Sequence, residues 1–459
     1  MLPFWVWFMA ASMVGLLAVR LLRPQARRLA YRMAVRTRRQ LGYRMNPITV
    51  TRKQRLKVEL LHDEVLGEAI REMAAEQGVA EGDLLARASG FLDEIIPQFN
   101  LLTTYRVGKR LASMSLRAFY RVRIGRSAEV ELNAIPRNAS VVYVMNHRSN
   151  ADYVLVAFLL ANRVAVSYAV GEWARIWPLE TLFKSFGAYF IRRKFRDPLY
   201  HRVLERYVQR AVEAGIPQGI FPEGGLSRDG SLQPPKLGIL DYMVRSGARD
   251  LVFIPIGINY DRVMEDSNLL REVQGLPRRG PLALWRRTAY WSLGLAFRTA
   301  TGRFSLFGYA VANVGAPIRA REVWGDVALS TMDWETRKPL LQALGCHLMA
   351  AVAREVPITP VALVAWCHQS LGKGISPAVL ERRSLALMAW AQEKGLPLYE
   401  ARGDFHHVYR CGLRVLLLRG ILVEGEGCLQ RSPEKGDLVD YYARSIDHHC
   451  QAFRPAETP

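Results

Sequence analysis

The stretch "VVYVMNHRSNADYVLV", from Val141 to Val156, combines the patterns of a strand and of a helix. Its first residues are apolar and β-branched, as in a buried strand, and its last residues form a longer apolar run, as in a helix. Polar residues gather between the two segments: Asn146, His147, Arg148, Ser149, Asn150 and Asp152. We call residues 146–152 the polar turn, and we expect it to join a core strand to a core helix.

The alternation of strand and helix continues on both sides of the polar turn. Strands are expected at "SVVYVM", "AVSYAV", "GAYFIRR", "QGIFPE", "LVFIPIGINY" and "FGYAVANVG", and helices at 150–162, 178–186, 197–214 and 236–246. Several of these strands are apolar throughout, which is typical of parallel strands covered on both faces. The pattern therefore predicts an α/β domain at residues 126–325, with a largely parallel central sheet flanked by helices.

The segments on either side of this domain are expected to be helical. Residues 58–125 and residues 326–459 carry apolar positions at spacings of three and four. Within the α/β domain, residues 283–297 are aromatic but are interrupted by Arg286 and Arg287. This segment is too short between charges to cross a bilayer, so we expect an interfacial or core helix there.

The N-terminus indicates a membrane anchor. Residues 2–19 carry no charge, and a run of arginines follows from Arg20 onward. Because positive charge marks the cytoplasmic flank of a span, residues 1–22 are expected to anchor the chain with its body in the cytoplasm. A helix lying in the membrane interface is the alternative reading. Residues 23–57 form a basic juxtamembrane segment suited to anionic lipids.

Charge and cysteine content narrow the class of protein. The net charge is +21, which favours nucleic acid, an anionic membrane or an acidic substrate as partner. The five cysteines form no C-x-x-C pair and have no zinc-finger spacing, so we expect reduced thiols and no metal. No phosphate-binding P-loop and no dinucleotide-binding glycine loop is present, and no cofactor is expected.

The polar turn carries a candidate general base. With His147 before the helix and Asp152 in its first turn, the carboxylate can reach back to one imidazole nitrogen and leave the other free to accept a proton. The spacing alone is also compatible with a capped helix and a surface histidine. Ser149 is an alternative nucleophile, although its position favours a helix cap.

Two further strand ends carry basic residues. In "GAYFIRRKFRDPL", Arg192 and Arg193 stand at the end of an expected strand. In "GIFPEGGLSRDGSLQPPKLG", another expected strand is followed by Glu223, Gly224 and Arg228, with Lys236 downstream. Parallel strand ends converge on one edge, where ligands bind. Arginines gathered there suit a phosphorylated substrate, and glycine allows a close backbone approach.

Four blocks, "NHRSNADY", "GAYFIRR", "FPEGGLSRDG" and "IPIGINYDRVME", resemble in order those of the glycerolipid acyltransferases. The closest branch is that of the glycerol-3-phosphate and dihydroxyacetone-phosphate acyltransferases, and the likeness extends over roughly residues 58–453. The resemblance implies His147 as general base and Asp152 as its orienting partner. It implies substrate binding by residues of the other blocks: Arg192 or Arg193, Glu223, Gly224, Arg228, Lys236 and Pro255. Leu226 departs from the pattern, because an arginine often stands there.

The resemblance implies acyl transfer from acyl-CoA or acyl-carrier protein to the sn-1 hydroxyl of glycerol 3-phosphate, the first step of phospholipid biosynthesis. Expected partners are these substrates and anionic membrane lipids, without nucleic acid, at the cytoplasmic face of a bacterial inner membrane. Alternative acceptors are lysophosphatidic acid and dihydroxyacetone phosphate. A basic membrane-surface binding protein is the non-enzyme alternative.

Overall fold

The computed structural model describes residues 53–96, 116–117, 119–136, 138–160, 167–171, 188–192, 195–248, 250–276, 307–325, 329–372, 374–399 and 403–453. The expected anchor at 1–22, most of the basic segment at 23–57 and the segments 178–186 and 283–297 lie outside this part. Among the described residues, no helix combines the length and the apolar character needed to cross a bilayer.

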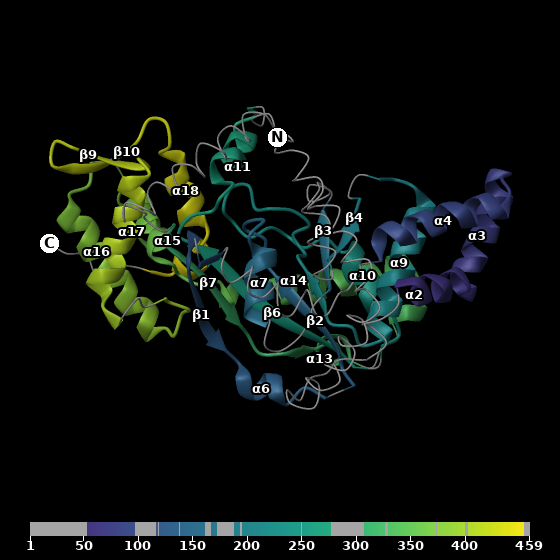
Figure 1. Cartoon of the computed structure of the whole chain (residues 1–459). Helices are drawn as coiled ribbons and strands as arrows, with labels where there is room; N and C mark the ends of the chain where they lie inside the picture. The colour runs from purple at the N-terminus through teal and green to yellow at the C-terminus, as the bar shows by residue number, and fades with distance from the viewer. Residues whose placement is uncertain are drawn as a thin grey trace, which may run out of the picture.

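A mixed eight-stranded sheet occupies the centre of the described chain. Its main path runs in the order β1-β7-β6-β2-β5-β3-β4, and β8 pairs with β6 off this path (Figure 1). The strands are β1 (Arg121–Ser127), β2 (Ser140–Met145), β3 (Ser167–Gly171), β4 (Ala188–Ile191), β5 (Gln218–Ile220), β6 (Leu251–Tyr260), β7 (Tyr309–Val314) and β8 (Ile318–Arg319).

The expectation of a largely parallel sheet holds from β6 to β4 and fails beyond β6. Strands β2, β3, β4, β5 and β6 pair in parallel, as crossover helices require. Strands β7 and β8 instead pair antiparallel to β6, and β1 pairs parallel to β7. The chain direction of β1 and β7 is therefore reversed. Strand β1 also begins at Arg121, inside the segment that was expected to be helical.

Helices cover both faces of the sheet. The helices of the α/β region are α6 (Glu129–Asn133), α7 (Asp152–Leu160), α9 (Pro198–Glu213), α10 (Gly238–Val244), α11 (Asp266–Val273) and α13 (Ala320–Trp324). Alternate residues of β2 enter different cores, because successive side chains of a strand point to opposite faces. Val142 and Val144 pack with residues of α9, whereas Tyr143 and Met145 pack with residues of α7.

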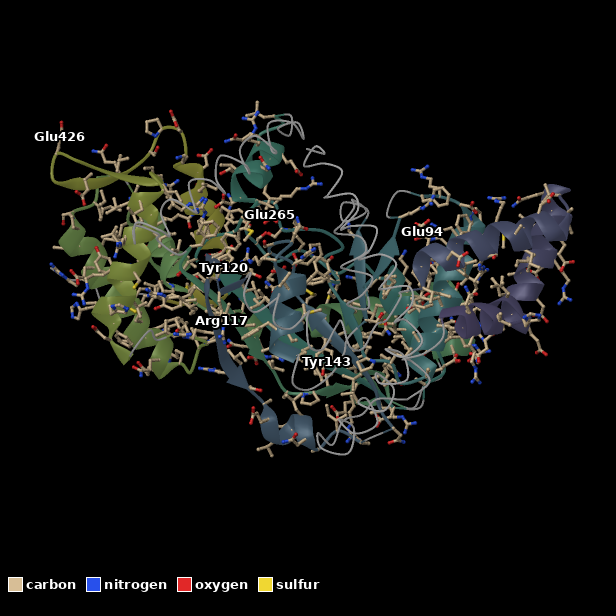
Figure 2. All side chains as sticks on the ribbon, viewed as in Figure 1. Glu94, Arg117, Tyr120, Tyr143, Glu265 and Glu426 are labelled. Atoms are coloured by element: carbon tan, nitrogen blue, oxygen red, sulfur yellow. The ribbon has the colours of Figure 1, made fainter. Side chains whose placement is uncertain are left out.

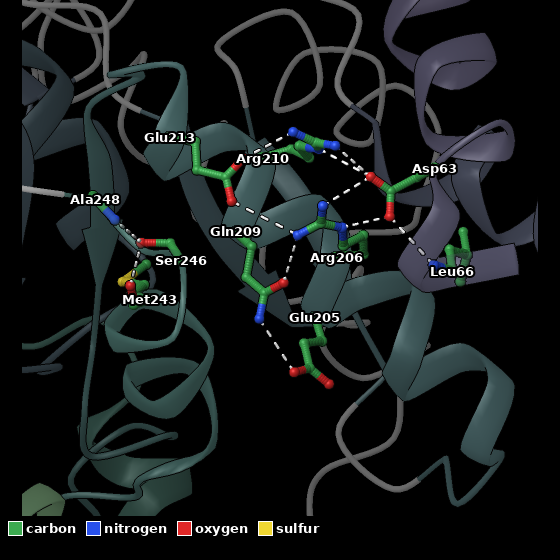
Figure 3. Close-up of polar contacts among 10 residues, drawn as sticks. All are labelled: Asp63, Leu66, Glu205, Arg206, Gln209, Arg210, Glu213, Met243, Ser246 and Ala248. Atoms are coloured by element: carbon green, nitrogen blue, oxygen red, sulfur yellow. Dashed lines mark hydrogen bonds and ion pairs between the residues drawn. The ribbon is translucent and has the colours of Figure 1, made fainter. Parts of the chain in front are cut away.

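The N-terminal helices α2 (Lys53–Leu61), α3 (Glu64–Gln77) and α4 (Glu81–Ile95) lie beyond the β4 edge. A cluster of charges around the buried Asp63 ties α3 to α9 (Figure 3). The carboxylate of Asp63, which caps α3, accepts hydrogen bonds from Arg206 at 2.6 and 2.8 Å and from Arg210. Burial would raise the pKa of Asp63, but these guanidinium groups outweigh it and lower that pKa.

The C-terminal region comprises a 3-10 turn at Leu329–Thr331, α14 (Trp334–Glu355), α15 (Pro360–Leu371), α16 (Pro377–Glu393), α17 (Phe405–Leu418), α18 (Asp437–Arg444) and α19 (Asp447–Cys450). From α15 onward this region lies beside β1 and β7, whereas α14 packs across β6 and β2 (Figure 1). The expected helical character is accompanied by one antiparallel hairpin, β9 (Leu422–Gly425) with β10 (Cys428–Arg431). Apolar residues of this region share a continuous core with β6, β7 and α7.

Candidate active site

The polar turn connects β2 to α7 and is buried. His147 is 1% exposed and Asp152 is 0% exposed. Nδ1 of His147 lies 2.9 Å from Oδ2 of Asp152, so the carboxylate reaches back to the ring as the sequence predicted. Asn146 anchors the start of the turn by exchanging two hydrogen bonds with the backbone of Ile258 in β6, at 2.8 and 2.9 Å.

Asp152 accepts hydrogen bonds from three further donors. Its Oδ2 accepts the backbone N–H groups of Arg148 at 2.7 Å and Ser149 at 3.0 Å. Its Oδ1 accepts the hydroxyl of Tyr260, the last residue of β6, at 2.7 Å. A carboxylate oxygen accepts hydrogen bonds, so the contact favours the tautomer with the proton on Nδ1 of His147, which leaves the lone pair of Nε2 free. This tautomer is the one that a general base requires.

Two aromatic rings hold the imidazole in place. Phe221 stacks on His147 with ring centroids 4.2 Å apart, and Tyr153 meets it edge-on at 5.5 Å. Phe221 follows β5 and Tyr153 lies in the first turn of α7, so two different elements hold the ring. A ring that is packed on its face and hydrogen-bonded at Nδ1 presents Nε2 in one direction. Such preorganisation favours proton transfer.

The loop after β5 holds His147 by its backbone. Oε1 of Glu223 accepts the N–H of His147 at 2.8 Å, and the N–H of Ser227 donates to the carbonyl oxygen of His147 at 2.9 Å. Oε2 of Glu223 accepts the N–H of Gln233 at 3.1 Å. In this structure both oxygens of Glu223 therefore position the backbone. The resemblance implied a substrate contact for this residue.

Glu223 titrates near neutral pH. Burial raises the pKa of its carboxyl to about 7, against the lowering effect of the backbone hydrogen bonds and of the Arg148 charge. Below about pH 4.5 the group is protonated in both the folded and the unfolded state. Between about pH 4.5 and 7 the unfolded chain ionises first, so folding stability falls as pH rises through this window.

We therefore expect the pH dependence of stability to change in Glu223→Gln. The variant has no ionisable group at this position, so its stability does not fall through this window as that of the unsubstituted protein does. The difference between the two free energies of unfolding, variant minus unsubstituted protein, should therefore rise by a few kcal/mol from pH 4.5 to pH 7. Chemical denaturation at several pH values measures this difference. A difference that stays constant across the window would show that Glu223 ionises with an ordinary pKa.

Gly224, Arg228 and Lys236 lie on the same loop, next to Glu223. Gly224 has a φ of +66°, and a Cβ there would lie 2.6 Å from Cδ of Lys236. The left-handed backbone conformation therefore favours glycine, whereas the lysine side chain could move away from a Cβ. The side chain of Arg228 is 68% exposed, with Nε 3.5 Å from Glu272, and Lys236 is exposed as well. These two cations are accessible to an anionic substrate.

Arg192 lies farther from the polar turn and has a protein partner. It follows β4, which is three strands from β2 and hence about 14 Å away at the usual strand spacing. Its Nε and Nη2 bind the two oxygens of Glu94 in α4 at 2.9 and 2.6 Å (Figure 2 labels Glu94). Arg193 lies outside the described residues. The structure thus places Arg228 and Lys236 on the loop that holds His147, and Arg192 at the sheet edge.

Pro255 lies inside β6 and not in the polar turn. It is buried opposite Val144 of β2, and its carbonyl oxygen accepts the N–H of Gly315 at 2.9 Å. A central strand tolerates proline only where its missing N–H is not needed. Pro255 stands between the β6 residues that pair with β8 and those that pair with β7. Among the described contacts, none joins it to His147 or Asp152.

The sequence did not predict roles for Tyr260, Phe221 or Glu265. Tyr260 lies in the fourth block, "IPIGINYDRVME", which was the available signal. Glu265 accepts the hydroxyl of Ser149 at 2.8 Å and the N–H of Asn150 at 3.2 Å. The Ser149 hydroxyl donates to Glu265 and accepts the N–H of Ala151, so it stabilises the turn. Because α7 begins at Asp152, Ser149 lies ahead of the cap position of that helix, which it was expected to occupy. Among the described residues, no cluster of histidine, cysteine or acidic side chains could hold a metal ion.

Comparisons with known proteins confirm the resemblance that the motifs indicated. Residues 127–259 match the family model described as "Acyltransferase". A glycerol-3-phosphate acyltransferase of Shewanella baltica is 27% identical over 85% of this chain and 49% of its own length. Proteins of the same name are 32% identical in Aeromonas hydrophila (47% of this chain, 28% of the relative) and 29% identical in Shewanella woodyi (64% and 36%).

The chain spans about half the length of these curated relatives, or less. A solved structure, the 1-acyl-sn-glycerophosphate (LPA) acyltransferase PlsC from Thermotoga maritima, shares 16% identity over 65% of this chain and 97% of its own. Its TM-score of 0.32 is too low to bear on the fold or the acceptor.

Proposed function

We propose, from the acyltransferase domain at residues 127–259, that this chain transfers a fatty acyl group from an acyl thioester to the sn-1 hydroxyl of glycerol 3-phosphate. The observation that carries the proposal is the 2.9 Å contact between Nδ1 of His147 and Asp152 within that domain. The curated relatives, which are named glycerol-3-phosphate acyltransferases, support the choice of acceptor.

The chemistry needs one base and no covalent acyl-enzyme. Nε2 of His147 takes the proton of the acceptor hydroxyl as its oxygen attacks the thioester carbonyl. Asp152 stabilises the imidazolium that forms, as the buried carboxylate does in a serine triad. Collapse of the tetrahedral intermediate breaks the carbon–sulfur bond, and the imidazolium returns its proton to the leaving thiolate. Acyl-CoA and acyl-carrier protein both supply such a thiol.

The acceptor phosphate would be bound by Arg228 and Lys236. Both side chains are exposed on the loop whose backbone holds His147. Guanidinium and ammonium groups match phosphate oxygens, and the hydrogen bonds between this loop and the backbone of His147 keep the loop next to the base. Binding the phosphate there would orient the glycerol hydroxyl for deprotonation.

One assay tests this function. The purified protein is given labelled acyl-CoA or acyl-carrier protein with glycerol 3-phosphate, dihydroxyacetone phosphate or lysophosphatidic acid as separate acceptors. We expect acylation of glycerol 3-phosphate well above the other two. Absence of transfer to every acceptor would contradict the enzyme assignment and favour a basic membrane-surface protein.

We also propose that residues 1–22 anchor the chain in a bacterial inner membrane with the catalytic domain on the cytoplasmic side. Deletion of residues 1–22 should leave the basic segment, so a fraction of the truncated protein should bind anionic vesicles and be released by salt. Vesicles of neutral lipid are the control. Carbonate-resistant association of the truncated protein would contradict a single anchor and indicate a second inserting segment.

A further inference from the structure

The C-terminal region contacts the loop that stabilises the polar turn. This loop follows β6 and ends at Glu265, which accepts hydrogen bonds from Ser149 and Asn150 (Figure 2 labels Glu265). The same turn supplies the Ser149 N–H that binds Asp152 at 3.0 Å. A shift of Glu265 would therefore change the orientation of Asp152 and, through it, of the His147 ring.

The next residue, Asp266, is held by two residues of the C-terminal region. Asp266 is 2% exposed, and its Oδ2 accepts the hydroxyl of Tyr442 in α18 at 2.5 Å and Nη2 of Arg419 at 2.6 Å. Arg419 directly follows α17. A buried carboxylate is tolerated only when it is paired and hydrogen-bonded, so this contact joins the first residue of α11 to the C-terminal helices.

All hydrogen-bonding positions of the Tyr442 hydroxyl are used. It donates to Asp266, and it accepts Nη1 of Arg419 at 2.7 Å and the N–H of Val263 at 3.1 Å. Val263 belongs to the same loop as Glu265 and Asp266. The hydroxyl thus holds this loop at two points, three residues apart, and connects both to the C-terminal helices.

We infer that Tyr442 and Arg419 are positioning residues for acyl transfer, acting through Asp266 and Glu265 on the turn that carries His147 and Asp152. They do not contact the reacting atoms. Glu265, whose pKa is raised by burial, receives its two hydrogen bonds from the turn only while the loop stays in place. The inference rests on the proposed acyl transfer for its kinetic readout, and on hydrogen exchange for an independent one.

The adjacent tyrosine provides a matched control. The hydroxyl of Tyr441 is buried on the same helix and has no hydrogen-bond partner among the described residues. Tyr441→Phe and Tyr442→Phe therefore remove the same atom from neighbouring buried positions, and only the second change breaks the contact with the loop.

We expect Tyr442→Phe to lower kcat by about 10-fold, the rate equivalent of one hydrogen bond, with the KM of both substrates changed less than about twofold. In hydrogen exchange, the amides of residues 146–152 should exchange faster than in the unsubstituted protein. Tyr441→Phe should match the unsubstituted protein in both measurements. Arg419→Lys keeps the charge but cannot hold Asp266 and Tyr442 together, so it should show the same pattern and replaces Tyr442→Phe if that variant does not fold.

An unchanged kcat in a folded Tyr442→Phe, or unchanged exchange of the turn in both variants, would overturn the inference. Equal losses in Tyr441→Phe and Tyr442→Phe would also overturn it, because they would indicate a general packing effect. If the unsubstituted protein transfers no acyl group, the proposed function fails, and hydrogen exchange alone still tests the coupling between Tyr442 and the turn.

Discussion

Replacement of His147 by alanine is expected to lower kcat by about 100-fold or more, the usual effect of losing a general base. The base is already oriented in this structure, because Asp152 binds Nδ1 and Phe221 stacks on the ring. Asp152→Asn should also be severe, since an amide in place of the carboxylate disturbs the tautomer while the shape is preserved. Steady-state kinetics with labelled acyl thioester measure both effects.

A second histidine–carboxylate pair provides the control. Nδ1 of His406 lies 2.9 Å from Glu381, the same distance as in the buried pair, but the histidine side chain is 58% exposed. His406→Ala should leave kcat within about twofold, because an exposed pair contributes little and lies outside the polar turn. Circular dichroism should show that all three variants remain folded. Near-normal turnover by a folded His147→Ala variant would contradict the role of His147 as general base.

Arg228→Ala is expected to raise the KM for glycerol 3-phosphate by about 10- to 100-fold, while the KM for the acyl donor changes little. Glycerol 3-phosphate is small, so most of its binding energy comes from its phosphate, and one charged hydrogen bond contributes about 1.5–3 kcal/mol. The resemblance implied an arginine at position 226, and the leucine present there leaves fewer cations on this loop to compensate. Arg228→Lys should recover part of the affinity, because it restores charge without the planar fork.

Arg410 is the matched control for Arg228. Its side chain is 66% exposed and Nη2 lies 3.7 Å from Asp404, compared with 68% and 3.5 Å for Arg228 and Glu272. Arg410→Ala should leave both KM values unchanged. Lysophosphatidic acid can offset a lost phosphate contact by burying its chain, at roughly 0.8 kcal/mol per methylene. A higher rate with lysophosphatidic acid than with glycerol 3-phosphate would contradict the proposed acceptor. The assignment to the acyltransferases would still stand.

The local elements of the α/β domain could be predicted from the sequence. The stretch "LVFIPIGINY" is β6 (Leu251–Tyr260), and the expected helix at 197–214 is α9 (Pro198–Glu213). Apolar periodicity and turn residues act over a few positions, which is why they indicate these elements reliably. The contact between His147 and Asp152 could also be predicted, because both residues belong to one strand-to-helix turn.

Partners that are distant in the sequence could not be predicted in this way. Tyr260 meets Asp152 only because β2 and β6 are neighbours in register, with Ser140 opposite Leu251. The preference of Arg192 for Glu94 likewise depends on α4 packing against the β4 edge. A basic residue at a strand end indicates an anion but does not identify it, and here the anion is a carboxylate of the protein.

The order of the strands from β2 to β7, the polar turn and the base–carboxylate pair could be predicted from the sequence, because they depend on contacts within a few residues. Three features followed only from the packing of the chain: the reversed direction of β1 and β7, the use of Glu223 to hold the backbone of His147, and the contact of Tyr442 with Asp266. These features join segments separated by tens to hundreds of residues. The physical reason is that buried polar groups must find hydrogen-bond partners, and only the packed chain determines which groups are within reach.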